Sequence, residues 1–151
     1  MKISTLVLAG AALLACAAPA SAQAAPTAAD SAAIRAAALD YVEGWYTGDA
    51  ERMARAVHPE LAKRVVETDA AGVSQMGRMG AADLVGQTRE GGGRDTPADR
   101  RQKDVVILDI FGNAASVRAT MSGWIDYMHL AKWNGQWKIV NVLWELKPRA
   151  R

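Results

Sequence analysis

Hydrophobic and polar residues alternate along the last third of the chain, residues 104–147, in four runs separated by pairs of turn-forming residues. The runs are VVILDIF, AASVRATM, WIDYMHLAKW and QWKIVNVLWEL. A period of two is typical of half-buried strands, and Asn134-Gly135 between two such runs indicates a two-residue hairpin turn, because that turn needs positive φ at both positions. Residues 112–113 and 122–123 suit the same kind of turn. We therefore expect a four-stranded antiparallel meander.

The register across these turns divides the meander into two faces. A two-residue loop at Asn134-Gly135 sets Met128 opposite Asn141, and it places Asp126 and Asn141 on the same face. That face is otherwise apolar apart from Glu145, and helices must cover it; it also takes in Val106, Leu108 and Leu143. The other face is mixed but gathers Ile125, Tyr127, Val140, Val142 and Trp144. It is too apolar for a freely solvated surface, and a second subunit is a natural cover. A single β-bulge would exchange part of the two faces.

The preceding part of the chain has helical periodicity. Apolar residues at positions 34, 38, 41, 42 and 45 are three or four apart, which predicts a helix from Thr27 or Asp30 to about Thr47. Gly48 is a helix stop and Asp49 an N-cap for a second helix. That helix ends at His58-Pro59, because the residue before proline is pushed out of the α region.

Four shorter segments follow. The run PELAKRVV, 59–66, suits a short helix beginning at proline, and residues 73–79 a short strand. Residues 81–89 suit another short helix, and 90–103 a polar, glycine-rich surface loop. Helices followed by a meander predict an α+β fold, in which a curled sheet over a long helix leaves a cone with an open wide end.

The first 22 residues predict a signal peptide. Lys2 precedes an apolar run, and Ala20-Ser21-Ala22 is an A-x-A cleavage site. The organisation expected is a signal peptide at 1–22, a linker at 23–29 and one domain at 30–148, in a periplasmic or secreted protein after cleavage near Ala22. The run LLAC ending at Cys16 approximates a bacterial lipobox, so a lipoprotein anchored through Cys16 is the alternative. Without that lipid no membrane contact is expected.

Composition excludes several classes of function. The single cysteine is Cys16, so the folded domain carries no disulfide or thiolate chemistry. Two histidines without an H-E-x-x-H or C-x-x-C motif argue against a metal site. The net charge is +2, and the basic residues are spread along the chain, which argues against nucleic acid. The glycine run at 91–93 lacks the Lys-Ser/Thr of a phosphate loop. No cofactor is expected.

Several segments carry a resemblance to a known family. They are the helix pattern Tyr41…Trp45…Gly48-Asp49…His58-Pro59 and the runs DYMHLAK at 126–132 and GQWKIVN at 135–141. Over about residues 28–148 the chain resembles the Putative lumazine-binding family of the NTF2-like (SnoaL-like) superfamily, which also holds ketosteroid isomerases and scytalone dehydratase.

The resemblance implies a fold, a pocket and an assembly. The fold is an NTF2-like cone, or cystatin-like α+β roll, with N-terminal helices packed on a curved antiparallel sheet and a pocket between them. It also implies frequent homodimers through the convex sheet face. It implies no reaction, and the name records only a suggested pteridine-like ligand. No tyrosine here matches the isomerase position, and the register turns His129 outward, away from the interior where the dehydratase has histidines.

Asp126 is the strongest candidate for chemistry. A lone carboxyl among apolar neighbours is desolvated and suits a general acid or base, or a ligand anchor. The alternative is a structural carboxylate bonded to an amide or a tyrosine, or one near the wet rim. Asn141 is expected close enough to share its network, and it is equally suited to orienting a heterocycle or to satisfying Asp126.

The remaining pocket candidates each have a structural alternative. Aromatic and methionine side chains suit a flat ligand but equally a core, and these are Tyr41, Trp45, Met121, Trp124 and Met128. His58 suits a base at the pocket mouth or a capping residue.

Three functions follow. The preferred one is a protein that binds a small, flat or heterocyclic molecule in an apolar pocket without catalysis. The second is an isomerase, dehydratase or cyclase using Asp126 as general acid or base, assisted by Asn141 or His58. The third is a structural, dimeric interaction module with a closed interior.

Overall fold

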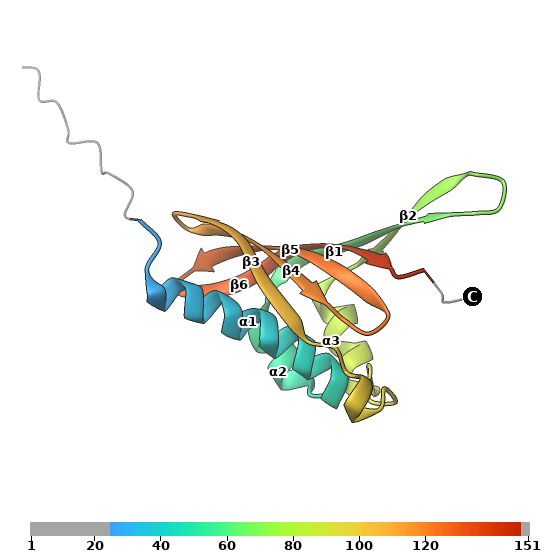
Figure 1. Ribbon diagram of the computed structural model, residues 1–151, viewed down its shortest axis with the longest axis horizontal. Helices are drawn as coiled ribbons and strands as arrows, with labels where there is room; N and C mark the ends of the chain where they lie inside the picture. The colour runs from blue at the N-terminus through green and yellow to red at the C-terminus, as the bar shows by residue number, and fades with distance from the viewer. Residues whose placement is uncertain (1–24, 149–151) are drawn as a thin grey trace, which may run out of the picture.

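A computed structural model describes residues 25–148, which form three α-helices and a six-stranded sheet. In Figure 1 the helices lie below the sheet. The predicted signal peptide, its cleavage site near Ala22 and Cys16 lie outside these residues. In chain order the elements are α1 (Ala28–Thr47), α2 (Ala50–Ala56), β1 (Val57–Thr68), β2 (Ser74–Met79), α3 (Ala81–Arg89), the 3₁₀ turn η1 (Ala98–Arg100), β3 (Asp104–Phe111), β4 (Ala114–Thr120), β5 (Trp124–Trp133) and β6 (Gln136–Leu146). The predicted α+β fold is confirmed.

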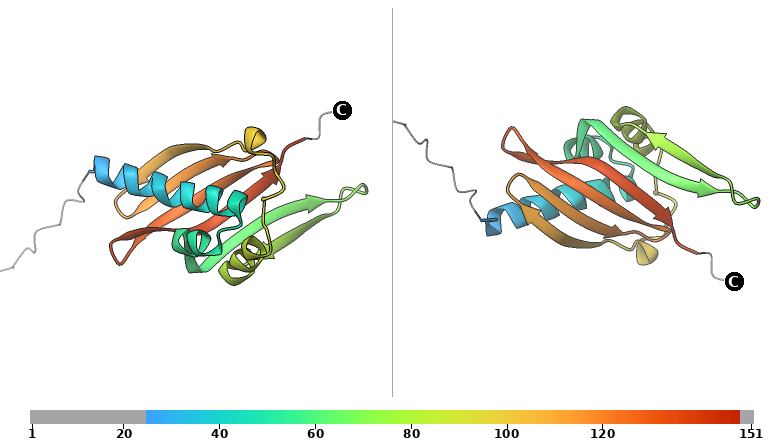
Figure 2. Two further views of the ribbon diagram at one scale, coloured as in Figure 1. Left: turned by 90° about the horizontal axis from the view of Figure 1, so that it is seen from below. Right: turned by 90° about the horizontal axis from the view of Figure 1, so that it is seen from above.

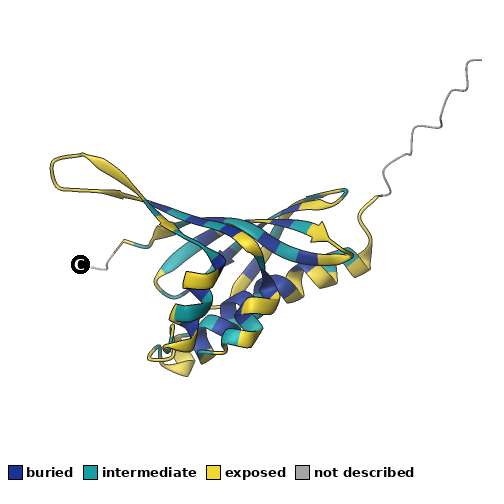
Figure 3. Cartoon of the chain, turned by 180° about the vertical axis from the view of Figure 1, so that it is seen from behind, coloured by how far each residue is buried: buried dark blue, intermediate teal, exposed yellow. Residues whose placement is uncertain are grey.

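The sheet has the strand order β2-β1-β6-β5-β4-β3. Strands β3 to β6 form the predicted antiparallel meander, β1 runs parallel to β6, and β2 pairs with β1 at the edge. Figure 2 shows the helices on one face of the sheet and the other face uncovered. The β1–β2 hairpin extends past the body of the sheet (Figure 1), and its far end is exposed (Figure 3).

Local sequence explains the ends of the long helix. Thr27 and Asp30 form a capping box at the start of α1, within the predicted interval. Gly48 ends the helix in the left-handed region at φ 66°, and Asp49 caps α2 through the backbone N–H of Arg52. Among residues 25–148, no helix is long and apolar enough to cross a membrane.

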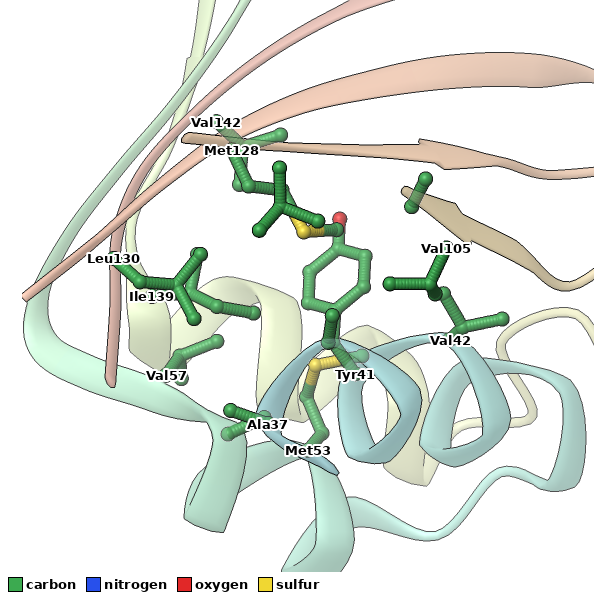
Figure 4. Close-up of a cluster of buried hydrophobic side chains, with 14 of the residues drawn as sticks. Ala37, Tyr41, Val42, Met53, Val57, Val105, Met128, Leu130, Ile139 and Val142 are labelled. Carbon is green, nitrogen blue, oxygen red and sulfur yellow. The ribbon is translucent and has the colours of Figure 1, made fainter. Parts of the chain in front are cut away.

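The core lies between α1 and the meander. In Figure 4 the ring of Tyr41 points from α1 toward the sheet and lies among the side chains of Val105, Met128 and Val142. Met121 is also fully buried in this cluster. In Figure 3 the buried residues, in dark blue, lie on the sides of the helices and the sheet that face each other.

The predicted short helix at 59–66 is wrong, because these residues form the middle of β1. Leu61, Lys63 and Val65 alternate inward and are buried. Because Lys63 occupies the central inward-facing position, it interrupts the alternation of apolar and polar residues by which a strand is recognised in a sequence. Pairing with β2 on one side and β6 on the other then overrides the local preference.

A β-bulge corrects the predicted faces of β6. His129 pairs with Asn141 but Leu130 pairs with Ile139, so Val140 is the extra residue. Beyond the bulge, Val142 is fully buried and Trp144 points inward, whereas Asn141, Leu143 and Glu145 point outward. The prediction that Asn141 shares the inner face with Asp126 is therefore wrong.

A second bulge has the same effect in β3. It lies between Ile107 and Asp109, and it turns Val106 and Leu108 outward where the alternation had placed them inward. The face of β5 is as predicted, with Asp126, Met128 and Leu130 buried.

Candidate functional site

A cavity of about 210 Å³ lies between the end of α1, helix α3 and the sheet. It is lined by Tyr41, Trp45, Lys63, Met79, Leu84, Gln87, Trp124, Trp144 and Leu146. Most of this lining is aromatic or aliphatic, and Lys63 is the residue that brings a full charge to it.

Asp126 lies beneath this cavity and is completely buried. Its Oδ1 accepts a hydrogen bond of 2.7 Å from Lys63 Nζ and a longer one of 3.5 Å from the Tyr41 hydroxyl. Its Oδ2 accepts a hydrogen bond of 2.9 Å from Trp124 Nε1. Both oxygens act as acceptors, which is the arrangement of an ionised carboxylate. The three donors all belong to residues that line the cavity, whereas Asp126 itself does not.

Lys63 reaches the same point from β1, on the far side of β6. Its Nζ donates to the Tyr41 hydroxyl oxygen at 2.8 Å as well as to Asp126. It lies 5.1 Å from the centroid of the Trp144 ring and 5.5 Å from that of Tyr41, so the cation also faces two aromatic rings. Burial lowers the pKa of Lys63, and the attraction of the Asp126 carboxylate opposes this without cancelling it.

Tyr41 completes the network from α1. Burial, followed by the nearby Asp126 charge, raises the pKa of the Tyr41 hydroxyl well above its ordinary value. The hydroxyl therefore stays protonated, accepts from Lys63 and directs its own proton toward Asp126. Lys63, Tyr41 and Trp124 are each fixed by the buried carboxylate.

Three tryptophans form a connected wall. Trp45 and Trp124 meet edge to face at 6.0 Å between ring centroids, and Trp124 and Trp144 do so at 6.3 Å. The loop after α3 holds Trp45 in place, because Gly93 N–H donates to the Trp45 carbonyl at 2.9 Å. A Cβ on Gly93 would lie 2.6 Å from the Trp45 ring, so the glycine run allows close approach to an indole.

The structure brings together only part of the predicted site. Tyr41, Trp45 and Trp124 line the cavity above Asp126, whereas Met121 and Met128 are core residues that do not reach it.

His58 and Asn141 lie elsewhere. His58 packs edge to face against Trp133 at 4.9 Å, and its Nδ1 accepts from the backbone N–H of Glu60. Asn141, on the outer face, accepts from Arg64 at 3.0 Å and contacts His129 Nδ1 at 3.2 Å.

Sequence reasoning missed six lining residues, which are Lys63, Met79, Leu84, Gln87, Trp144 and Leu146. Lys63 was hidden by the helix assigned to its segment, and Trp144 by the bulge in β6. The available signal for Lys63 was its position between Leu61 and Val65 with a period of two. In the part of the chain that the structure describes, no group of three His, Cys, Asp or Glu side chains could hold a metal ion.

Comparison with known proteins identifies a family and a fold. A family model described as "Putative lumazine-binding" matches residues 29–145. An NTF2-like protein of unknown function from Shewanella baltica OS155 is 20% identical with a TM-score of 0.61, over 83% of this chain and 100% of that one. One from Methylobacillus flagellatus KT is 24% identical with a TM-score of 0.63, over 82% and 96%.

A domain of unknown function with a cystatin-like fold from Nostoc punctiforme is also similar, with 16% identity and a TM-score of 0.53, over 82% of this chain and 81% of that one. At these identities the likeness shows the fold alone, and it confirms the NTF2-like, cystatin-like architecture. Comparison with curated protein sequences gives no match.

Proposed function

Because the chain belongs to the Putative lumazine-binding family, we propose that it binds a small planar molecule of one or two rings in the cavity between α1, α3 and the sheet. The observation that carries this proposal is a hollow walled by Trp45, Trp124 and Trp144 with Lys63 and Tyr41 at its floor. Few polar groups in an apolar, aromatic hollow are the usual make-up of a small-molecule site.

The size of the cavity sets the size of the ligand. Its volume of about 210 Å³ exceeds the roughly 150 Å³ of an engineered cavity that binds benzene. It is smaller than the roughly 300 Å³ at which drug-sized pockets begin. One ring or two fused rings fit these limits, and a larger ligand would leave part of itself outside. Each aromatic contact contributes about 0.5–1.5 kcal/mol beyond the area it buries.

Binding without catalysis is the reading that the geometry favours. Asp126, the candidate acid or base, has both oxygens bonded to protein donors and does not line the cavity. Among the described residues that line it there is no aspartate, glutamate or histidine. Asp126 therefore serves better to hold Lys63, Tyr41 and Trp124 than to exchange protons with a ligand.

The test fills the cavity with an introduced tryptophan side chain, and a variant with a tryptophan at an exposed position is the control. Met79→Trp enlarges a residue that lines the cavity, whereas Met76→Trp places the same group on an exposed position of the same strand. We expect lumazine, followed by calorimetry, to bind wild type and Met76→Trp alike and Met79→Trp at least tenfold more weakly. Equal binding to all three, with thermal unfolding confirming that Met79→Trp is folded, would place the ligand elsewhere.

We propose further that the chain forms a homodimer through the outer face of the sheet. Leu108, Tyr127 and Leu143 lie on this face with 51%, 46% and 49% of their surface exposed, and Val106 is 40% exposed. Exposed apolar residues that gather on one face mark an interaction surface. Sedimentation of the purified protein gives its mass in solution directly, and a monomer at all concentrations would refute the dimer.

Export to the periplasm or medium stays a prediction from residues 1–22. The mass of the mature protein tests it, because cleavage after Ala22 leaves Gln23 first, whereas lipidation leaves an acylated Cys16. A protein that keeps residues 1–22 uncleaved in cells with a working export system would refute both cleavage after Ala22 and lipidation at Cys16.

A further inference from the structure

The charge of Lys63 at the floor of the cavity is balanced by that of Asp126, which lies beneath the floor. Lys63 Nζ and Asp126 Oδ1 are 2.7 Å apart, and side-chain exposure is 8% and 0%. Since both carboxylate oxygens accept hydrogen bonds, the negative charge of Asp126 balances the ammonium of Lys63 where little water can screen either.

The same floor offers a ligand a donor. An ammonium group has three N–H bonds, and within residues 25–148 Lys63 gives two of them, to Tyr41 and to Asp126. The Trp124 N–H is already bonded to Asp126, and the Tyr41 proton is directed toward the same carboxylate. Lys63 lines the cavity, and its third N–H is the charged donor that a ligand can meet there; the side-chain N–H groups of Trp45, Gln87 and Trp144, which also line it, are neutral.

Building on the proposed function, we propose that the cavity selects an uncharged planar ring that carries a carbonyl oxygen or ring nitrogen as acceptor, and that this acceptor binds Lys63 Nζ. A carboxylate of the same shape would add a second negative charge beside Asp126 and leave the buried group with an unbalanced charge. A cationic ring would be repelled by the ammonium group of Lys63. The ligand class is therefore a neutral aromatic ring with one hydrogen-bond acceptor placed to meet Lys63 Nζ.

Three fused two-ring probes of similar outline test this. They are quinolin-2-one with a neutral lactam, naphthalene with no polar group, and naphthalene-2-carboxylate with a full charge. A hydrogen bond to a charged donor strengthens binding roughly tenfold to hundredfold. We expect quinolin-2-one to bind at least about tenfold more tightly than either of the others, as measured by ligand-observed NMR titration at neutral pH.

The possible results separate the two proposals. Equal affinity for quinolin-2-one and naphthalene would overturn the role of Lys63 while leaving the aromatic cavity as the site. Tightest binding of the carboxylate would overturn the neutral ligand class and make Lys63 an anion site. No binding of any probe would overturn the proposed function itself.

A pair of variants isolates the lysine. Lys63→Met combined with Asp126→Asn removes both charges together, which avoids leaving one of them buried alone. We expect the preference for quinolin-2-one over naphthalene to fall close to one in this variant. Lys103→Met, which removes an exposed lysine outside the cavity, keeps the preference. An unchanged preference in the double variant would refute the contact with Lys63.

Discussion

Replacing Lys63 and Asp126 singly and together measures what the buried ion pair contributes to the fold. Lys63→Met leaves the Asp126 carboxylate buried with only the neutral donors of Tyr41 and Trp124. Asp126→Asn leaves the ammonium of Lys63, a residue that is 7% exposed, without its counter-charge. Removing one partner of a buried pair costs about 3–5 kcal/mol, because the other charge stays behind.

The cost of Asp126→Asn has an upper limit that follows from proton release. A lysine with the ordinary pKa of 10.5 can shed its proton at neutral pH for about 5 kcal/mol, at about 1.36 kcal/mol per pKa unit. The double variant carries neither charge, and we expect it to lose no more stability than either single variant. The coupling between the two positions is then about 3 kcal/mol.

The assay is urea unfolding of wild type, the two single variants and the double variant at pH 7 and again near pH 9. In Asp126→Asn the unfolded chain binds more protons at Lys63 than the native protein does, so its stability rises as pH increases toward the ordinary lysine pKa. The stability of Lys63→Met does not rise with pH in this way, because this variant has no lysine at position 63 to titrate. Additive losses, with coupling below about 0.5 kcal/mol, would refute the ion pair as the organiser of the site.

Three further changes test other parts of the structure. The pKa of Asp30 is held well below its ordinary value, chiefly by the hydrogen bond from Lys132. The stability that Asp30 contributes is therefore present above about pH 4 and is lost as pH falls below that value. Asp30→Asn should flatten the fall in melting temperature between about pH 5 and about pH 2, and an unchanged slope would refute this. Gly93→Ala crowds the Trp45 ring and should cost about 1–3 kcal/mol in urea unfolding. Gly123→Ala, with open space around it, should stay within about 0.5 kcal/mol, and similar losses would contradict the close contact. Leu143→Lys should shift sedimentation toward monomer without unfolding the protein; an unaffected dimer would exclude this face.

Elements whose pattern is local were predictable from the sequence. The meander followed from Asn134-Gly135 and its alternating neighbours, and α1 from the three- and four-residue spacing of its apolar residues. Each depends on residues close together in the chain, where turn geometry and helical periodicity leave few alternatives. The family resemblance added the fold, which the matched residues 29–145 and the similar structures confirm.

The site depended on contacts between distant segments, and there the prediction was incomplete. Asp126 was placed on the inner face from its own strand, but its partner Lys63 is 63 residues away. An inward-facing lysine breaks the apolar alternation of β1, so the same residue that charges the cavity also conceals the strand that carries it. A buried carboxylate does, however, require a donor or cation nearby. That requirement could have prompted a search for an inward-facing lysine or arginine.

The bulge in β6 explains both why Asn141 was placed on the wrong face and which residues line the cavity. By inserting Val140, it turns Asn141 to the outer face beside Arg64 and brings Trp144 inward over Lys63 Nζ. Had β6 been regular, an amide would have been placed near Asp126 and no indole would have covered the lysine. The exchange replaces a second polar group by an aromatic wall, which makes the cavity more apolar and leaves Lys63 as the charged residue of its lining. A strand irregularity of one residue therefore decides which side chains line the cavity in which we propose that a flat ring with one acceptor binds.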